Sequence, residues 1–356
     1  MAYTTIDDPS AHFHTQIYTG NGSSGLSITN DANAGNFQPD LLWIMPRSNG
    51  DNGVCFDSSR GEDRQLKFNG DDAEDTHSPA RVTFESDGFD LDTTDSNYNG
   101  SSRTYVSWQW KMNAGSTTSG GGDDSIATST YQANTTAKQS IVTYTGEASA
   151  KTVAHGLGVK PNVIIVKCRQ TKDWHAYFDA SPSVSDPETD YLRPNTNLAL
   201  TDNDTSWNDT APTTSVFTIG SGSGGDANGN TDTFVAYCFA SVQGYSKFGS
   251  YEGNYNTDGT FIWCGFKPAW VTVKECDNTN DWDIRDAARN PYNPVDNWLR
   301  FNTTDGEGDS DGIDFLSNGF KIRQASNRTN RNGTLVYMAF AEQPFVTSGG
   351  VPCTAR

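Results

Sequence analysis

Residues 104–110 have the sequence Thr-Tyr-Val-Ser-Trp-Gln-Trp, and the pattern returns as Thr-Phe-Val-Ala-Tyr-Cys-Phe at 233–239 and as Thr-Leu-Val-Tyr-Met-Ala-Phe at 334–340. In each copy bulky side chains alternate with smaller ones. A half-buried antiparallel strand requires this period of two, because successive side chains point to opposite faces of a sheet. The three stretches therefore predict three equivalent strands, each closing one of three similar units.

An earlier strand of each unit begins at a proline, and an aspartate follows that proline at a constant distance. The pairs are Pro39 and Asp57, Pro161 and Asp179, and Pro268 and Asp286, all with the same separation along the chain. A residue repeated in three copies of a fold more often holds a turn or a backbone N–H group than performs catalysis. We therefore interpret these six residues as structural.

These repeats divide the chain into five parts. They are a first unit with an N-terminal arm (1–115), a Gly/Ser/Thr-rich linker (116–137), a second unit (138–245), a third unit (246–345) and a tail (346–356). Short strand patterns separated by Gly-containing turns predict an all-β protein of three tandem antiparallel β-sandwiches. We expect jelly-roll topology, with an immunoglobulin-like arrangement as the alternative. The linker predicts that the first unit swings or exchanges between subunits, whereas the other two pack together.

Composition limits the class of protein. The 356 residues include 25 Lys and Arg against 44 Asp and Glu, a net charge of −19, which argues against binding to nucleic acid or to an anionic bilayer. Aromatic residues make up 12% of the chain, which argues against disorder. No apolar stretch approaches the length of a membrane-spanning helix, and the first residues lack the features of a signal peptide. We expect synthesis in the cytoplasm and free thiols at the six cysteines.

Four tryptophans lie near predicted loops and are candidate ligand-binding residues: Trp174, Trp207, Trp282 and Trp298. Aromatic rings on loops can stack on the faces of sugars. The alternative is that these rings cap sheet edges or fill interfaces between units, and the sequence favours neither.

An acidic, Gly-rich stretch in the third unit is a candidate calcium site. Its carboxylates are Asp305, Glu307, Asp309 and Asp311. Clustered oxygen ligands on a flexible loop suit Ca²⁺, although the spacing does not match an EF-hand. The alternative is a solvated acidic loop, and no other cofactor is expected.

We expect no enzymatic activity, because serine-nucleophile, phosphate-loop and dinucleotide motifs are missing. A glycosidase would need paired carboxylates in one cleft. The repeated aspartates are the best-placed candidates for such a pair, yet each unit supplies only one.

With the units in place, the full chain resembles a family of virion-associated proteins of marine bacteriophages, of the cyanophage and pelagiphage type. The resemblance implies a structural or tail-fibre protein with concanavalin-A-like jelly-roll domains, and it supplies no catalytic residues. The stretches that carry it include Ile6-Asp7-Asp8-Pro9-Ser10, Tyr105-Val106-Ser107-Trp108, Trp207-Asn208-Asp209-Thr210-Ala211-Pro212-Thr213, Gly244-Tyr245-Ser246-Lys247-Phe248-Gly249-Ser250-Tyr251 and Phe315-Leu316-Ser317-Asn318-Gly319-Phe320.

We expect the first of three functions, and the other two are alternatives. The first is a tail-associated or fibre-like appendage on the virion surface that contacts the host cell and binds its glycans. The second is a capsid decoration (head-binding) protein, and the third is a glycan depolymerase. The expected partners are other virion proteins and further copies of the chain, with a homotrimer favoured.

Overall fold

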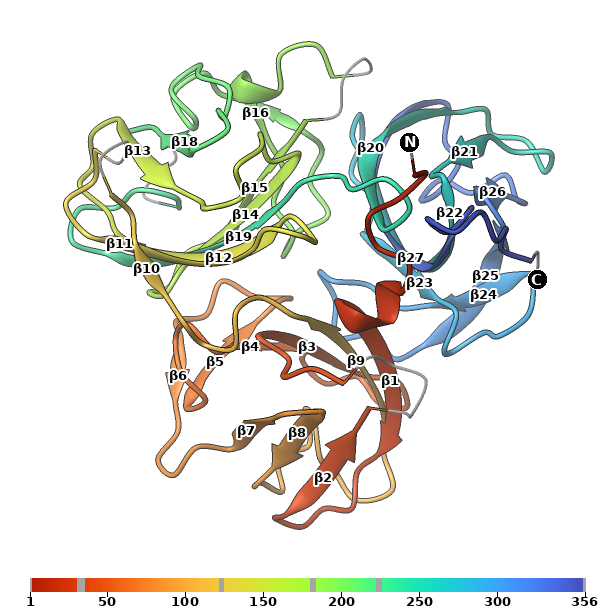
Figure 1. The fold of residues 1–356 in the computed structure, drawn as a ribbon, viewed down its shortest axis with the longest axis horizontal. Coiled ribbons are helices and arrows are strands. Elements are labelled where there is room, and N and C mark those ends of the chain that lie inside the picture. Colours follow the sequence, from red (N-terminus) through yellow and green to blue (C-terminus); the bar gives the residue numbers. More distant parts are fainter. Residues whose placement is uncertain (1, 31–35, 122–124, 180–183, 222–225, 355–356) are drawn as a thin grey trace.

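The computed structural model describes residues 2–30, 36–121, 125–179, 184–221 and 226–354. It confirms the predicted fold class: the protein is all-β, built from antiparallel sheets that pack as sandwiches. Helical structure in the described residues consists of two short 3-10 turns, Pro9–Ala11 and Pro187–Thr189. None of the described helices has the length and hydropathy needed to cross a bilayer. Three lobes surround a common centre, one for each sequence repeat (Figure 1).

The first lobe pairs a six-stranded sheet, in the order β1-β9-β3-β4-β5-β6, with an outer three-stranded sheet, β2-β8-β7. The outer sheet contains a tight Asp-Gly hairpin between β7 and β8, as the sequence indicates. The strands are β1 (Phe13–Thr19), β2 (Leu26–Thr29), β3 (Leu41–Pro46), β4 (Val54–Asp57), β5 (Arg64–Lys67), β6 (Asp75–Thr76), β7 (Val82–Glu85), β8 (Gly88–Leu91) and β9 (Thr104–Trp110).

The second lobe has a six-stranded sheet, β10-β11-β12-β19-β14-β15, faced by two short two-stranded sheets, β13-β18 and β16-β17. Its strands are β10 (Thr118–Ser119), β11 (Ser129–Asn134), β12 (Gln139–Thr145), β13 (Lys151–Ala154), β14 (Val163–Cys168), β15 (Trp174–Phe178), β16 (Asp190–Tyr191), β17 (Thr201–Asp202), β18 (Val216–Ile219) and β19 (Thr233–Phe239).

The expected linker over 116–137 differs from the structure. Strands β10 and β11 fall within that range and pair with each other, and β11 extends the sheet through β12. Residues 122–124 of the expected linker lie outside the described residues. Polar Ser, Thr and Asn side chains conceal these strands in the sequence, because a strand with one solvated face needs few apolar residues.

The third lobe has two four-stranded sheets, β20-β27-β22-β23 and β21-β26-β25-β24. Pro268 lies at a shift of register in β22, where the missing N–H of a proline is tolerated because the regular ladder is interrupted. The strands are β20 (Ser246–Gly253), β21 (Phe261–Trp263), β22 (Phe266–Glu275), β23 (Asp283–Asp286), β24 (Val295–Trp298), β25 (Gly308–Leu316), β26 (Gly319–Ile322) and β27 (Gly333–Pro344).

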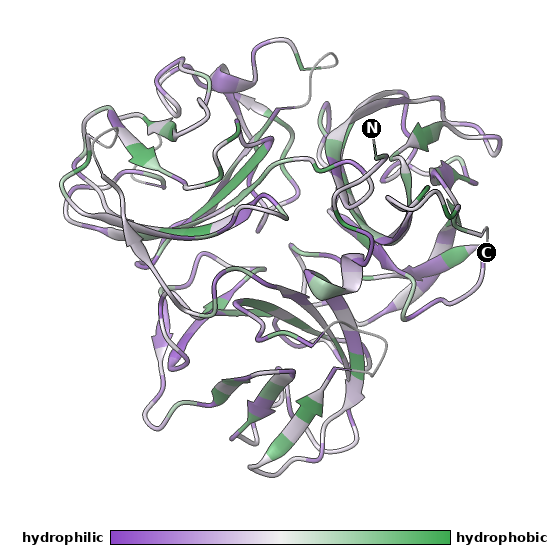
Figure 2. Cartoon of the chain, in the orientation of Figure 1, coloured by the Kyte–Doolittle hydropathy of each residue, from purple (hydrophilic) through white to green (hydrophobic). Residues whose placement is uncertain are grey.

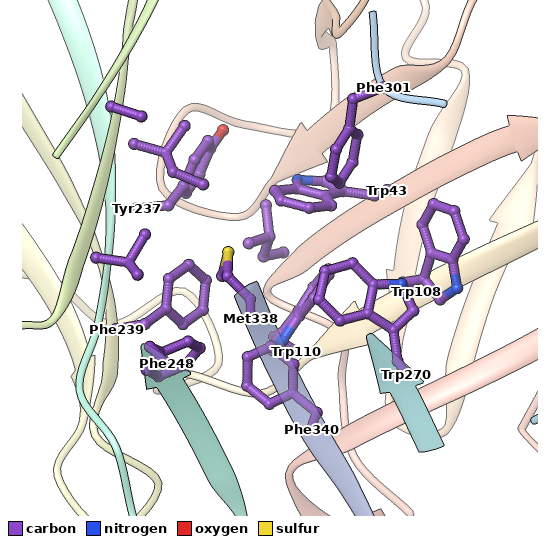
Figure 3. Close-up of a cluster of buried hydrophobic side chains, with 14 of the residues drawn as sticks. Trp43, Trp108, Trp110, Tyr237, Phe239, Phe248, Trp270, Phe301, Met338 and Phe340 are labelled. Carbon is purple, nitrogen blue, oxygen red and sulfur yellow. The ribbon is translucent and has the colours of Figure 1, made fainter. Parts of the chain in front are cut away.

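The closing strands β9, β19 and β27 are buried on both faces, which the predicted half-buried pattern does not capture. In β9, Tyr105 faces the interior of its own sandwich, while Trp108 and Trp110 face a core shared by all three lobes. Equivalent residues of β19 and β27 join that core, as Figure 3 shows for Tyr237, Phe239, Met338 and Phe340.

The shared core holds the three lobes together, and hydrophobic residues gather in strands while the loops are mainly hydrophilic (Figure 2). Trp43, Trp110 and Phe301 come from two different lobes, and the Trp43 ring meets the other two edge-to-face at centroid distances of 4.7 and 5.2 Å. Burying each such side chain is worth about 1.5–3 kcal/mol. The expectation that the first unit swings on its linker is wrong, because that unit contributes its largest side chains to the common core.

In the loop before each closing strand, the side-chain amide of a buried asparagine donates hydrogen bonds to two backbone oxygens. Asn228 donates from its amide to the backbone oxygens of Ser149 and Gly220, at 2.7 and 3.0 Å. Just before it, the carbonyl of Ala227 accepts a bond from the hydroxyl of Tyr144. The other lobes repeat both interactions with Asn99 and Tyr18, and with Asn330 and Tyr251.

Candidate functional site

Three of the four candidate tryptophans are inside the protein. Trp174, Trp207 and Trp282 are each at most 2% exposed, so none can stack on an external ligand. The expectation of a binding surface on loops is wrong for these three residues. Trp207 packs inside the second lobe, where its indole donates to the backbone oxygen of Asp190 at 2.9 Å.

Trp174 and Trp282 fill interfaces between lobes, which is the alternative that the sequence leaves open. The Trp174 indole, in the second lobe, donates to the backbone oxygen of Lys67 in the first lobe at 2.9 Å. The Trp282 indole, in the third lobe, donates to the backbone oxygen of Arg193 in the second lobe at 3.4 Å. Each tryptophan therefore fixes its lobe against the preceding one.

Trp298 is only partly buried and lies on β24. The guanidinium carbon of Arg300 is 4.0 Å from its ring centroid, and that of Arg328 is 5.6 Å away. Its indole donates to the hydroxyl of Ser310 at 3.0 Å. The ring is thus engaged by cation–π contacts within the chain.

The predicted calcium-binding loop is largely a strand, since β25 begins at Gly308 and contains Asp309 and Asp311. Arg300 binds Asp305 at 2.8 Å, and Arg328 binds Asp311 at 2.6 Å. Glu307 is held by two further arginines, so the carboxylates point to separate cations. Among the residues that the structure describes, no group of three or more His, Cys, Asp or Glu side chains could hold a metal ion.

The repeated aspartates are equivalent in two lobes and displaced in the other. Asp57 pairs with Leu41, and Asp286 pairs with Trp270. Leu41 and Trp270 each follow the repeated proline of their lobe by two residues. In the second lobe Phe178 takes that place, opposite Val163. Asp179 follows one residue later and forms an ion pair with Lys160 at 3.0 Å. The equal spacing in the sequence therefore does not correspond to equal positions in the fold.

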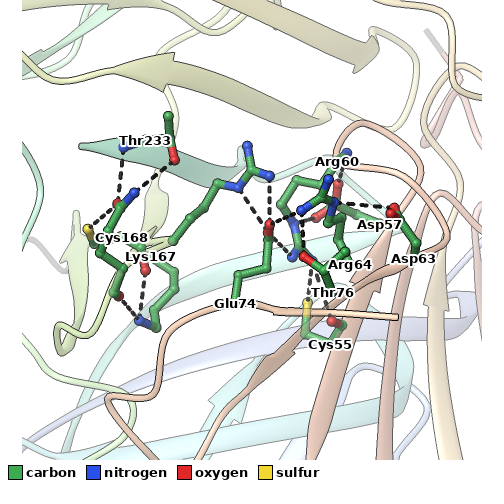
Figure 4. A network of polar contacts seen from close by, with 12 residues as sticks. Cys55, Asp57, Arg60, Asp63, Arg64, Glu74, Thr76, Lys167, Cys168 and Thr233 are labelled. Atoms are coloured by element: carbon green, nitrogen blue, oxygen red, sulfur yellow. Dashed lines mark hydrogen bonds and ion pairs between the residues drawn. The ribbon is translucent and has the colours of Figure 1, made fainter. Parts of the chain in front are cut away.

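Asp57 belongs to a network between the first and second lobes, shown in Figure 4 with Arg60 and Glu74. The Asp57 carboxylate accepts bonds from Arg60 Nε and from the hydroxyl of Tyr237, at 2.5 and 2.7 Å. Arg60 also donates to Glu74 at 2.9 Å, and Arg169 of the second lobe binds Glu74 through two nitrogens at 2.9 and 2.6 Å. Burial by itself would raise the pKa of Glu74, but the arginine bonds and charges outweigh it and hold that pKa below its ordinary value.

The same network recurs between the third and first lobes. Asp286 accepts from Arg289 at 2.6 Å and from the indole of Trp108 at 3.2 Å. Arg289 donates to Glu307 at 3.1 Å, and Arg47 of the first lobe binds Glu307 through two nitrogens at 2.9 Å. Two lobe interfaces thus contain the same arrangement of residues, in which a glutamate binds one arginine of its own lobe and one arginine of the adjacent lobe.

The third interface, between the second and third lobes, replaces these charges with apolar side chains. A backbone bond marks the equivalent position in each interface: the amides of Glu74, Glu307 and Leu200 donate to the carbonyls of Arg169, Arg47 and Cys276 at 2.7–2.8 Å. Leucine and cysteine therefore stand where the other interfaces have glutamate and arginine. This substitution breaks the threefold repetition in the interior.

The surface breaks the repetition as well. Of the seven large apolar side chains that are exposed among the described residues, five lie between 255 and 351, in the third lobe and the segment after it. Phe261 and Trp263 are 41% and 51% exposed and lie on one face of β21. Lys321 is opposite Phe261 on β26, and Asp314 is opposite Lys321 on β25. We call Phe261, Trp263, Lys321 and Asp314 the β21 face.

The other two lobes have small side chains at the positions of Phe261 and Trp263. Strands β2 and β13 correspond to β21, because each places one buried aliphatic residue opposite a phenylalanine of the strand that it pairs with in the sheet. These pairs are Ile262 and Phe320, Ile28 and Phe89, and Val153 and Phe217. The flanking residues are Ser27 and Thr29 in the first lobe and Thr152 and Ala154 in the second. The fold therefore does not require aromatic rings at these positions.

Sequence reasoning did not single out Phe261 or Trp263, because a short aromatic strand normally indicates a core. Aligning the segments between the Tyr-x-Gly triplet and the proline in the three units would have exposed the difference. The arginines of the lobe interfaces were also missed, since each pairs with a carboxylate from a distant part of the chain.

The chain belongs to a family described as a domain of unknown function, DUF7483, which matches residues 8–344. Searches of curated proteins and of solved structures each found no match. The family therefore adds no activity, ligand or partner to the geometry above.

Proposed function

We propose that this protein is a non-enzymatic structural component of a bacteriophage particle, a tail-associated or fibre-like appendage on the virion surface that contacts the host cell. The particle is what the resemblance of the sequence implies, and the observation that supports a structural role is the shared core, which joins three sandwiches and is flanked by two matched arginine–carboxylate networks. Such an interior suits a body that keeps its shape under load, because breaking any lobe contact exposes large aromatic surfaces.

The carboxylates support a role without catalysis. Asp57 and Asp286 each bind an arginine, and they lie at different lobe interfaces rather than in one cleft. A glycan depolymerase would bring two carboxylates to opposite sides of one sugar bond. The repeated aspartates of this chain do not converge in that way.

Immunogold labelling of purified particles tests the proposal, with the chain quantified in the same preparation by mass spectrometry. We expect label at the tail and a homotrimer of the released protein in sedimentation. Label spread over the capsid lattice would favour the decoration protein instead. Absence of the chain from purified particles would refute both structural roles.

A further inference from the structure

We propose that the β21 face binds a neutral polysaccharide, with Phe261 and Trp263 as stacking platforms. This inference deepens the proposed host contact and rests on it only for the biological source of the glycan. The starting observation is internal to the chain: two of its three equivalent strands have Ser, Thr or Ala where β21 has Phe and Trp. The fold does not require two exposed rings here, so a ligand is a physical reason to keep them.

The rings form a strip rather than a pocket. Phe261 and Trp263 are two residues apart on an edge strand, so their Cα atoms are about 6.8 Å apart along it. Residue Gly319, opposite Trp263, has no side chain that could cover the indole from β26. Phe345 meets Trp263 edge-to-face at 5.6 Å and supports it from the other side. An open strip of this kind suits an extended polymer better than a compact molecule, which needs a concave site.

Polar groups beside the rings fit sugar hydroxyls. Lys321 forms an ion pair with Asp258 at 2.8 Å, and Asp314 forms one with Arg323 at 3.2 Å. Lys321 also donates to the backbone oxygen of Gly259 at 2.9 Å, which leaves one of the three donors of its ammonium group. A carboxylate has about four acceptor sites, so the two pairs together keep capacity for hydroxyl groups that donate and accept. Aromatic rings cover the apolar face of the same sugar.

The charges select against other ligands. Lys321 and its neighbour Arg323 are already paired with carboxylates, and the chain carries a net charge of −19, so a polyanion meets no positive field. Insertion into a lipid bilayer would take both ion pairs into an apolar medium, at a large cost in free energy. A neutral glycan meets neither obstacle.

Affinity electrophoresis of the full chain tests the inference, with neutral glucans (laminarin and dextran) in the gel and alginate as an acidic comparison. The variant Phe261→Ser/Trp263→Thr copies the first lobe, so it should keep the fold, which circular dichroism and thermal unfolding verify. We expect a neutral glucan to retard the wild type and the variant to bind about tenfold or more weakly, a loss of about 1.4 kcal/mol. Tyr292→Ser removes a 79% exposed ring outside the β21 face and should bind like the wild type.

Three outcomes would overturn the inference. They are no retardation of the wild type by either neutral glucan, equal binding by the Phe261→Ser/Trp263→Thr variant, or stronger retardation by alginate. Sedimentation of the same proteins detects a further alternative: self-association that this variant abolishes would make the face a contact between copies of the chain. Location on the particle is measured independently, so failure here leaves the labelling result intact, and the reverse also holds.

Discussion

The contact between Glu74 and Arg169 gives the sharpest test of how the lobes are joined. The Glu74 side chain is 6% exposed and accepts three bonds from two arginines, one of which, Arg60, is fully buried. Glu74→Leu leaves that buried guanidinium with Asp57 as its one remaining carboxylate, so we expect a loss of about 3–5 kcal/mol in the free energy of unfolding. Arg169→Cys removes two of the bonds but leaves Glu74 paired with Arg60. Because Arg169 is 24% exposed, this loss should be smaller, about 1–2 kcal/mol.

The double variant Glu74→Leu/Arg169→Cys reproduces the Leu–Cys combination that the chain already uses at its third interface. Once Glu74 is absent, Arg169 has no carboxylate to bind, so the second substitution should add little. We expect the double variant to be less destabilised than the sum of the single variants by about 1–2 kcal/mol. Urea unfolding followed by tryptophan fluorescence measures the cycle, and Glu307→Leu/Arg47→Cys provides the matched cycle at the equivalent interface. Additivity within about 0.5 kcal/mol would refute the pairing.

Three further perturbations follow from the interior. Burial lowers the pKa of His175 to about 3 and that of His155 to about 4, so the unfolded chain binds more protons below pH 6.5 and stability should fall as the pH drops from 6.5 toward 3. His175→Phe should flatten this dependence in thermal unfolding between pH 7 and 4, and an unchanged slope would contradict it. Asn228→Ala removes the donor to the buried carbonyl of Gly220 and the donor to the exposed Ser149, and should cost about 1–3 kcal/mol in urea unfolding, whereas a change below about 0.5 kcal/mol would show that water replaces the amide. Gly146→Ala would drive its new methyl group into the carbonyl oxygen of Gly229, so we expect a clear fall in melting temperature, which an unshifted melting curve would disprove.

Much of the fold could be predicted because its signals are local. Alternation within residues 104–110 depends on neighbouring residues in one strand, and the Asp87-Gly88 and Asn318-Gly319 pairs specify tight hairpins by the freedom of glycine. These features predict an all-β protein of antiparallel sandwiches, and the structure confirms that prediction. The extent of the linker was wrong because polar strands such as β11 carry no strong local signal.

The candidate sites could not be predicted in the same way, because exposure is a property of the assembled protein. Trp174 and Trp282 follow loops in the sequence, yet neighbouring lobes cover them. Trp263 belongs to a strand, yet the lack of a side chain at Gly319 leaves its ring open to solvent. Whether an aromatic ring is buried or exposed therefore depends on the side chains and lobes that pack against it in the folded protein.

The sequence by itself determined the repeated strand set, the turns between strands and an acidic exterior, since these depend on residue type and spacing along the chain. The tertiary structure alone decided that the second face of each closing strand meets the other lobes rather than water. It also decided that Glu74 binds Arg169, 95 residues away in the chain, and that the rings of Phe261 and Trp263 are exposed to solvent. The physical reason is that burial and ion pairing depend on distances in space, and packing three similar units around one centre brings together residues that no local pattern connects.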